Sequence, residues 1–119
     1  MAKQEFAEKN ILLIIADELG KYLSCYGCRS LQTPNLAQLA ATGTRFTHAF
    51  ASTASCSGSR STIYTGLHTH ENGQYGLNMH HTHFQTFTHV DTAPTLFNDA
   101  GWLTGIIGKV HVGVPETYP

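Results

Sequence analysis

The chain is poor in charge, and neither sign dominates. Only 13% of its 119 residues are charged, and seven Lys and Arg against eight Asp and Glu give a net charge of −1. Proteins that bind nucleic acid or anionic membranes usually carry an excess of positive charge, and this chain has none. We therefore expect no nucleic acid and no membrane among its partners, and the composition leaves the oligomeric state open.

The sequence also lacks a long apolar run. The run that begins at Ile11 stops within six residues, at Asp17. Such a run is too short for the core of a signal peptide and far too short for a membrane span. The charged residues 1–9 before it are interpreted as an N-terminal extension. From these features we expect a cytoplasmic chain without a secretory leader.

Cysteine is scarce, and its count is odd. Three cysteines do not make a disulfide framework. Cys25 and Cys28 form a CxxC pair, but no second pair exists that would complete a zinc site. The pair therefore favours ordinary thiols over a redox or metal centre.

What the sequence does contain is an alternation of apolar runs and helical patterns. The continuous run in residues 10–20 is typical of a strand buried on both faces of a parallel sheet. The patterns predict strands at 10–20 and 102–109, helices at 33–43, 58–66 and 93–101, a strand or extended connector at 44–52, and a long loop at 67–92. This order predicts an α/β fold, a mostly parallel sheet flanked by helices. Because so few strands cannot bury both faces of such a sheet, residues 10–119 are interpreted as the N-terminal fragment of a larger domain.

Two adjacent carboxylates, Asp17 and Glu18, end the first apolar run. If that run is a strand, they lie at the carboxyl edge of the sheet, where ligands bind in open α/β folds. Adjacent carboxylates repel each other unless a cation neutralises them, and a hard divalent cation prefers oxygen ligands. The pair thus predicts a metal site. The alternative is a solvated helix start, where acidic side chains are common.

The stretch STASCSGSRSTIYTG, residues 52–66, places Cys56 and Arg60 four residues apart among small polar residues. If a helix begins near Cys56, the cysteine meets backbone N–H groups that stabilise a thiolate or a bound oxyanion. Arg60 then lies one turn further on the same face and can reach the same anion. Sulfate or phosphate would fit such a site. The alternative is a helix start with a half-buried cysteine.

The stretch GIIGKVHVG, residues 105–113, places Lys109 and His111 two residues apart. In extended backbone both side chains leave on the same face. A cation and a proton-transfer group at a strand end are typical of a sulfate or phosphate clamp with an acid–base partner. The alternative is a pair of exposed polar residues.

Taken together, the three segments resemble the sulfatase family. Residues 56–66 are similar to its signature, Cys-x-Pro-x-Arg followed by Thr-Gly. IIADELG, residues 14–20, resembles the family's first metal-binding strand, and GKVH, residues 108–111, its Gly-Lys-x-His element. The order and spacing fit over roughly residues 10–119. Similarity to the N-sulfoglucosamine sulfohydrolase branch lies in residues 65–77, 105–113 and 115–119.

The resemblance implies an alkaline-phosphatase-like fold and a substrate that is a sulfated small molecule or sulfated sugar. It also implies one divalent cation, usually Ca²⁺, held by Asp17, by Glu18 in place of the family's second aspartate, and by the residue at position 56.

The resemblance further implies catalytic roles for four residues. Cys56 would be oxidised to formylglycine, whose hydrate attacks sulfur, and Arg60 would hold that hydrate. Lys109 would bind sulfate oxygens, and His111 would hydrogen-bond the nucleophilic hydroxyl.

The chain departs from the family pattern at two positions. Gly58 stands where the signature has proline, which bears on whether Cys56 is converted to formylglycine. Glu18 lengthens a ligand by one methylene, which bears on metal preference. The leading interpretation is a sulfuric ester or sulfamide hydrolase. The alternatives are a phosphodiester or phosphonate hydrolase of the same superfamily, or a non-catalytic truncated remnant.

Overall fold

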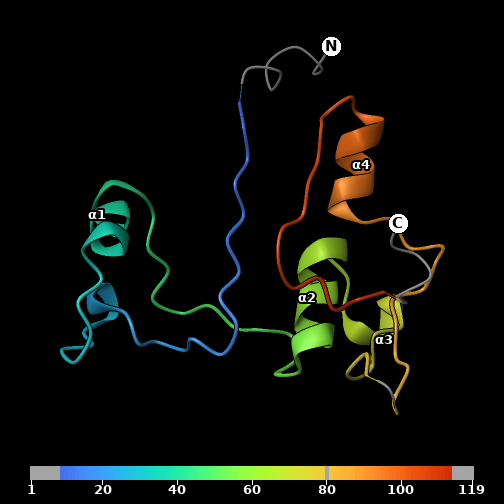
Figure 1. The fold of residues 1–119 in the computed structure, drawn as a ribbon, viewed down its shortest axis with the longest axis horizontal. Coiled ribbons are helices and arrows are strands. Elements are labelled where there is room, and N and C mark those ends of the chain that lie inside the picture. Colours follow the sequence, from blue (N-terminus) through green and yellow to red (C-terminus); the bar gives the residue numbers. More distant parts are fainter. Residues whose placement is uncertain (1–8, 80, 114–119) are drawn as a thin grey trace. The chain divides into compact units, whose positions relative to one another are not determined.

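The fold is known from a computed structural model that describes residues 9–79 and 81–113. The described chain consists of short helices joined by irregular segments (Figure 1). It forms two compact units that divide between Thr47 and His48, and each unit is described by itself.

The first unit contains the 3-10 helix η1, Ser24–Tyr26, and the helix α1, Pro34–Thr42. A proline at the first helical position favours a helix start, since its fixed φ is helical and it has no N–H to satisfy. Thr33, the N-cap of α1, lies 2.7 Å from the Ser24 hydroxyl, oxygen to oxygen. This bond ties η1 to the start of α1.

The second unit contains α2, Cys56–Thr65, α3, Thr69–Asn72, and α4, Ala93–Asp99, and α2 contacts both of the others. Gly66 ends α2 in the left-handed conformation, at φ 70°. A glycine adopts this backbone without the steric penalty of a side chain, which explains the sharp stop.

The interior of the second unit is polar. Among the described residues no hydrophobic side chain is buried, and the buried polar and charged side chains are Ser57, Arg60, Ser61, Asn72 and Gln74. They are paired by hydrogen bonds. The Gln74 amide donates at 2.7 Å to each of the carbonyls of Gly76 and Phe84, and the Asn72 amide donates at 3.1 Å to the carbonyl of Leu67. Hydrogen bonds between buried polar groups therefore connect the segments of this unit.

The predicted sheet is wrong for the described residues, which contain helices and no strand. The apolar run of residues 10–20 is not helical, and Ile11, Leu12, Leu13 and Ile14 are 61% to 84% exposed. In the run 102–109, Leu103 and Ile107 are fully exposed. A strand is held by hydrogen bonds to a neighbouring strand, and apolar composition alone does not supply that neighbour. The α/β sheet prediction fails for this reason.

The predicted helices are confirmed, with small shifts at their ends. α1 lies inside the predicted range 33–43, α2 begins two residues before the predicted 58, and α4 lies inside 93–101. The sequence patterns miss α3, which begins after a capping box between His68 and Glu71. Such a short helix depends on its caps rather than on apolar periodicity.

No helix in the described part of the chain is long and apolar enough to cross a membrane. Of the N-terminal extension 1–9 only Lys9 is described, and the similarity at 115–119 lies outside the described residues.

Candidate functional site

The site is built on the first turn of α2, which begins at Cys56. Ser55 precedes it in extended conformation and its carbonyl accepts the first bond of the helix, from the N–H of Ser59 at 2.8 Å. The first N–H groups of a helix have no partner within it, and their dipoles favour an anion. Cys56 is half-buried at this end. The helix start on which the anion-site hypothesis depends is therefore present.

Arg60 lies one turn further along α2 and is only 6% exposed. Its Nη1 donates to the backbone carbonyl of Lys109 at 2.6 Å, across 49 residues of sequence. A hydrogen bond from a charged donor is stronger than a neutral one, and the planar guanidinium fixes its direction. The structure thus brings Arg60 to the segment that carries Lys109 and His111, through the backbone of Lys109 rather than its exposed side chain.

His111 is half-buried, and its Nε2 lies 3.0 Å from the carbonyl oxygen of Asn78. The backbone N–H of Asn78 in turn donates to the Ser57 hydroxyl at 3.0 Å. Ser57 is the residue after Cys56. A chain of two hydrogen bonds therefore connects His111 to the first turn of α2.

Lys109 and His111 do not share one environment, since Lys109 is exposed and His111 is half-buried. The expectation that both leave on the same face assumed extended backbone. His111 instead has a φ of +58°, in the left-handed region. This conformation ends the regular alternation of an extended segment, and the shared-face expectation fails at that residue.

Asp17 and Glu18 lie in the first unit, and both are exposed. Glu18 has a φ of +57°, uncommon for a residue other than glycine. That these carboxylates join Cys56 in one site stays a prediction.

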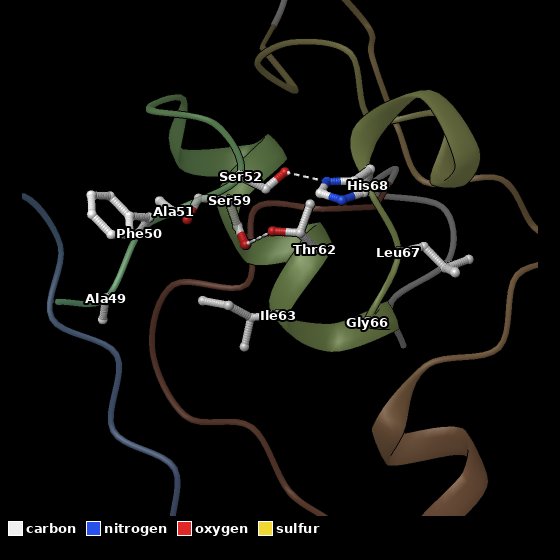
Figure 2. Close-up of a pocket in the computed structure, with 10 residues that line it drawn as sticks. All are labelled: Ala49, Phe50, Ala51, Ser52, Ser59, Thr62, Ile63, Gly66, Leu67 and His68. Atoms are coloured by element: carbon white, nitrogen blue, oxygen red, sulfur yellow. Dashed lines mark hydrogen bonds between the residues drawn. The ribbon is translucent and has the colours of Figure 1, made fainter. Parts of the chain in front are cut away.

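A cavity of about 430 Å³ lies beside α2. Figure 2 shows the side chains of Ser59, Thr62 and Ile63 directed toward it from the helix, and Ser52 facing His68 across its rim. The Ser52 hydroxyl lies 3.3 Å from Nδ1 of His68. None of the residues predicted for the site lines this cavity.

Sequence reasoning missed the polar residues that surround α2. Ser61 bonds Thr86 through their hydroxyls at 2.7 Å, and the side-chain amides of Asn72, Gln74 and Asn78 donate to backbone carbonyls. The available signal was the stretch ENGQYGLN, residues 71–78, in which amide side chains alternate with glycines. Amides among glycines are also typical of exposed turns, and the sequence alone does not separate the two cases.

Comparison of the sequence with known proteins identifies its family. A family model described as Sulfatase matches residues 9–117. The chain belongs to the sulfatase family. This confirms the family expected from the three motifs.

Several curated sulfatases are similar over nearly the whole chain. The N-sulphoglucosamine sulphohydrolase of Homo sapiens is 44% identical over 111 residues, covering 93% of this chain and 22% of the relative. Arylsulfatase A of Homo sapiens is 41% identical, covering 90% of this chain and 22% of the relative. The N-acetylgalactosamine-6-O-sulfatase of Bacteroides thetaiotaomicron is 34% identical, covering 93% and 22%. The chain thus spans about a fifth of the length of these sulfatases.

Proposed function

We propose that the chain is the nucleophile-bearing, N-terminal part of a sulfuric ester or sulfamide hydrolase, with a sulfated sugar or small molecule as substrate. The observation that carries this is the anchoring of Arg60, one turn after Cys56, to the Lys109–His111 segment. Similarity to a relative named N-sulphoglucosamine sulphohydrolase favours an N-linked sulfate.

Each side chain has a chemical task in this proposal. The first turn of α2 and the guanidinium of Arg60 attract the sulfate oxyanion to Cys56. Lys109, an exposed residue, binds sulfate oxygens as a point charge. His111 exchanges a proton with the attacking hydroxyl. Conversion of Cys56 to formylglycine would supply a hydrated carbon, one hydroxyl of which attacks sulfur while the other expels sulfate.

The donor chemistry decides which residues suit a divalent cation. The carboxylates of Asp17 and Glu18 are oxygen ligands of the kind that Ca²⁺ takes, and both side chains are exposed. The thiol of Cys56 is a soft ligand that suits other metals. We therefore propose that position 56 contributes to a calcium site only after its sulfur has been replaced by oxygen.

Gly58 is the observation that favours keeping the two alternatives to a sulfatase. If its departure from the proline signature leaves Cys56 a thiol, the same oxyanion site suits a phosphodiester or phosphonate hydrolase, or a non-catalytic remnant. A hydrazide probe distinguishes these cases, because it labels the formylglycine aldehyde and leaves a thiol unlabelled.

The test uses a longer protein that contains this chain, assayed with a chromogenic sulfate ester and with N-sulfoglucosamine. We expect turnover and hydrazide labelling in the parent, and loss of both in Cys56→Ala. The matched control is Cys25→Ala, which removes a thiol of the first unit outside the proposed site. Turnover that persists in Cys56→Ala would refute the proposal.

A further inference from the structure

The ring of His111 is held by a bond that identifies its protonated nitrogen. Nε2 lies 3.0 Å from the backbone oxygen of Asn78. A carbonyl oxygen only accepts hydrogen bonds, and therefore Nε2 must carry the hydrogen. In the neutral ring the lone pair is then on Nδ1, which is the nitrogen able to accept a proton.

Nδ1 of His111 is covered from solvent and has no hydrogen-bond partner in the part of the chain that the structure describes. A buried acceptor without a partner is destabilising. The left-handed backbone of the same residue, at φ +58°, is also strained. Both features fall on one residue, so its surroundings must hold it firmly in place.

Asn78 restrains His111 through three hydrogen-bonding groups. Its carbonyl accepts from the ring of His111, its N–H donates to the hydroxyl of Ser57, and its side-chain amide donates to the carbonyl of Gly113. Ser57 is fully buried in the first turn of α2, and Gly113 lies two residues after His111. Asn78 therefore fixes the histidine from both sides, through the helix and through the segment that carries the ring.

We propose that Asn78 is a positioning residue that holds His111 as the Nε2–H tautomer and leaves Nδ1 as its proton acceptor. The tautomer stands on the geometry alone, whereas the proton transfer rests on the proposed function. In that transfer a hydroxyl at position 56 gives its proton to Nδ1. The oxygen keeps the bonding electron pair and forms a bond to sulfur, while the bond from sulfur to the alcohol or amine breaks and its electron pair leaves with that group. The ring becomes an imidazolium with hydrogen on both nitrogens and can return a proton to the leaving group.

Nitrogen-15 NMR of a labelled longer protein that contains this chain tests the tautomer directly. Near pH 8, where an ordinary imidazole is neutral, protonated and bare ring nitrogens give separate resonances. We expect His111 to show a protonated Nε2 with a slowly exchanging hydrogen. In Asn78→Ala the carbonyl remains but loses its anchor to Gly113. Loss of about 1 kcal/mol of restraint should speed exchange of that hydrogen about fivefold.

Two variants make the experiment specific. Asn98→Ala removes an amide of the same unit that bonds Thr104 at 2.9 Å, and it should leave the His111 signals unchanged. His111→Gln keeps an N–H donor for the Asn78 carbonyl but has no basic nitrogen. It should therefore preserve the amide exchange of Asn78 while abolishing sulfate-ester turnover in the longer protein.

A protonated Nδ1 in the parent chain, or an Asn78→Ala spectrum identical to the parent, would overturn the proposal. An Nε2–H ring that responds to Asn78→Ala, in a longer protein without sulfate-ester turnover, would refute the proposed function and leave the role of Asn78 standing.

Discussion

Gly58, at the position of the signature proline, offers the sharpest test of how α2 is packed. A Cβ added at Gly58 would meet Cγ2 of Thr53 at 2.7 Å, the carbonyl oxygen of Gln74 at 3.3 Å and Cγ2 of Thr69 at 3.4 Å. Carbon atoms attract best at about 3.5–4.0 Å, so the first contact is strongly repulsive. Gly58→Ala and Gly58→Pro place a Cβ in this space and should both destabilise the first turn of α2.

The size of the effect follows from two opposing terms. Forcing a methyl group into a packed site costs about 1–3 kcal/mol, whereas replacing glycine by alanine within a helix returns about 1 kcal/mol. The net loss for Gly58→Ala is about 1 kcal/mol, which corresponds to a fivefold change in an equilibrium constant. Proline at this third helical position removes an N–H that has no intrahelical partner, and its penalty comes mainly from the same contact.

Amide hydrogen exchange across α2 measures this loss locally, without requiring cooperative unfolding of the whole chain. We expect exchange at Ser59 and Arg60 to be about fivefold faster in Gly58→Ala. The matched control is Gly105→Ala, because nothing lies within 4 Å of a Cβ built at Gly105. It should leave α2 unchanged.

A second substitution shows whether the contact with Thr53 is the cause. Thr53→Ser removes Cγ2 but keeps the hydroxyl, which accepts from the N–H of Ser55 at 3.4 Å. Combined with Gly58→Ala, it should restore slow exchange to at least the parent level. Exchange in Gly58→Ala as slow as in the parent, or no rescue in the double variant, would refute the packing argument.

Three further predictions concern the chain and the longer protein. The 119-residue chain should bind a hydrophobic dye and show no cooperative thermal transition, because large apolar side chains such as Leu12, Leu103 and Ile107 are exposed and no hydrophobic side chain among the described residues is buried. A sharp calorimetric peak without dye binding would contradict this. In the longer protein, Arg60→Lys should lower sulfate-ester turnover at least tenfold, since a lysine ammonium does not replace the planar guanidinium of arginine. The control Arg29→Lys, at an exposed position, should leave turnover unchanged. Equal rates in the two variants would exclude the role of Arg60. Cys56→Ser should gain the mass of a covalent sulfate with little turnover, because a serine ester has no second hydroxyl to expel sulfate; full turnover without added mass would show that formylglycine is not required.

The sequence alone determined the helices α1, α2 and α4 and the family of this protein, but not the short helix α3. Pro34 and Gly43 mark the ends of α1, and the polar run before Gly66 marks α2, because caps and breakers act over a few residues. The family followed from three motifs in order, and the match over residues 9–117 confirms it. Local signals of this kind need no knowledge of distant contacts.

The sequence led to a wrong prediction where burial of an apolar segment requires a neighbouring strand. Residues 10–20 have the composition of a buried strand, yet the described chain pairs them with no strand and leaves their side chains exposed. Apolar composition measures the free energy that burial would release, and the hydrogen-bonding neighbour that permits burial is a separate requirement.

Only the tertiary structure shows which residues of the second unit contact each other at the site. The bond from Arg60 to Lys109 spans 49 residues, and that from His111 to Asn78 spans 33. The close approach at Gly58 likewise depends on Gln74 and Thr69, which follow α2 in the chain. Such contacts arise from the path of the backbone between the two partners, since a hydrogen bond needs atoms about 3 Å apart and local residue preferences do not fix that distance.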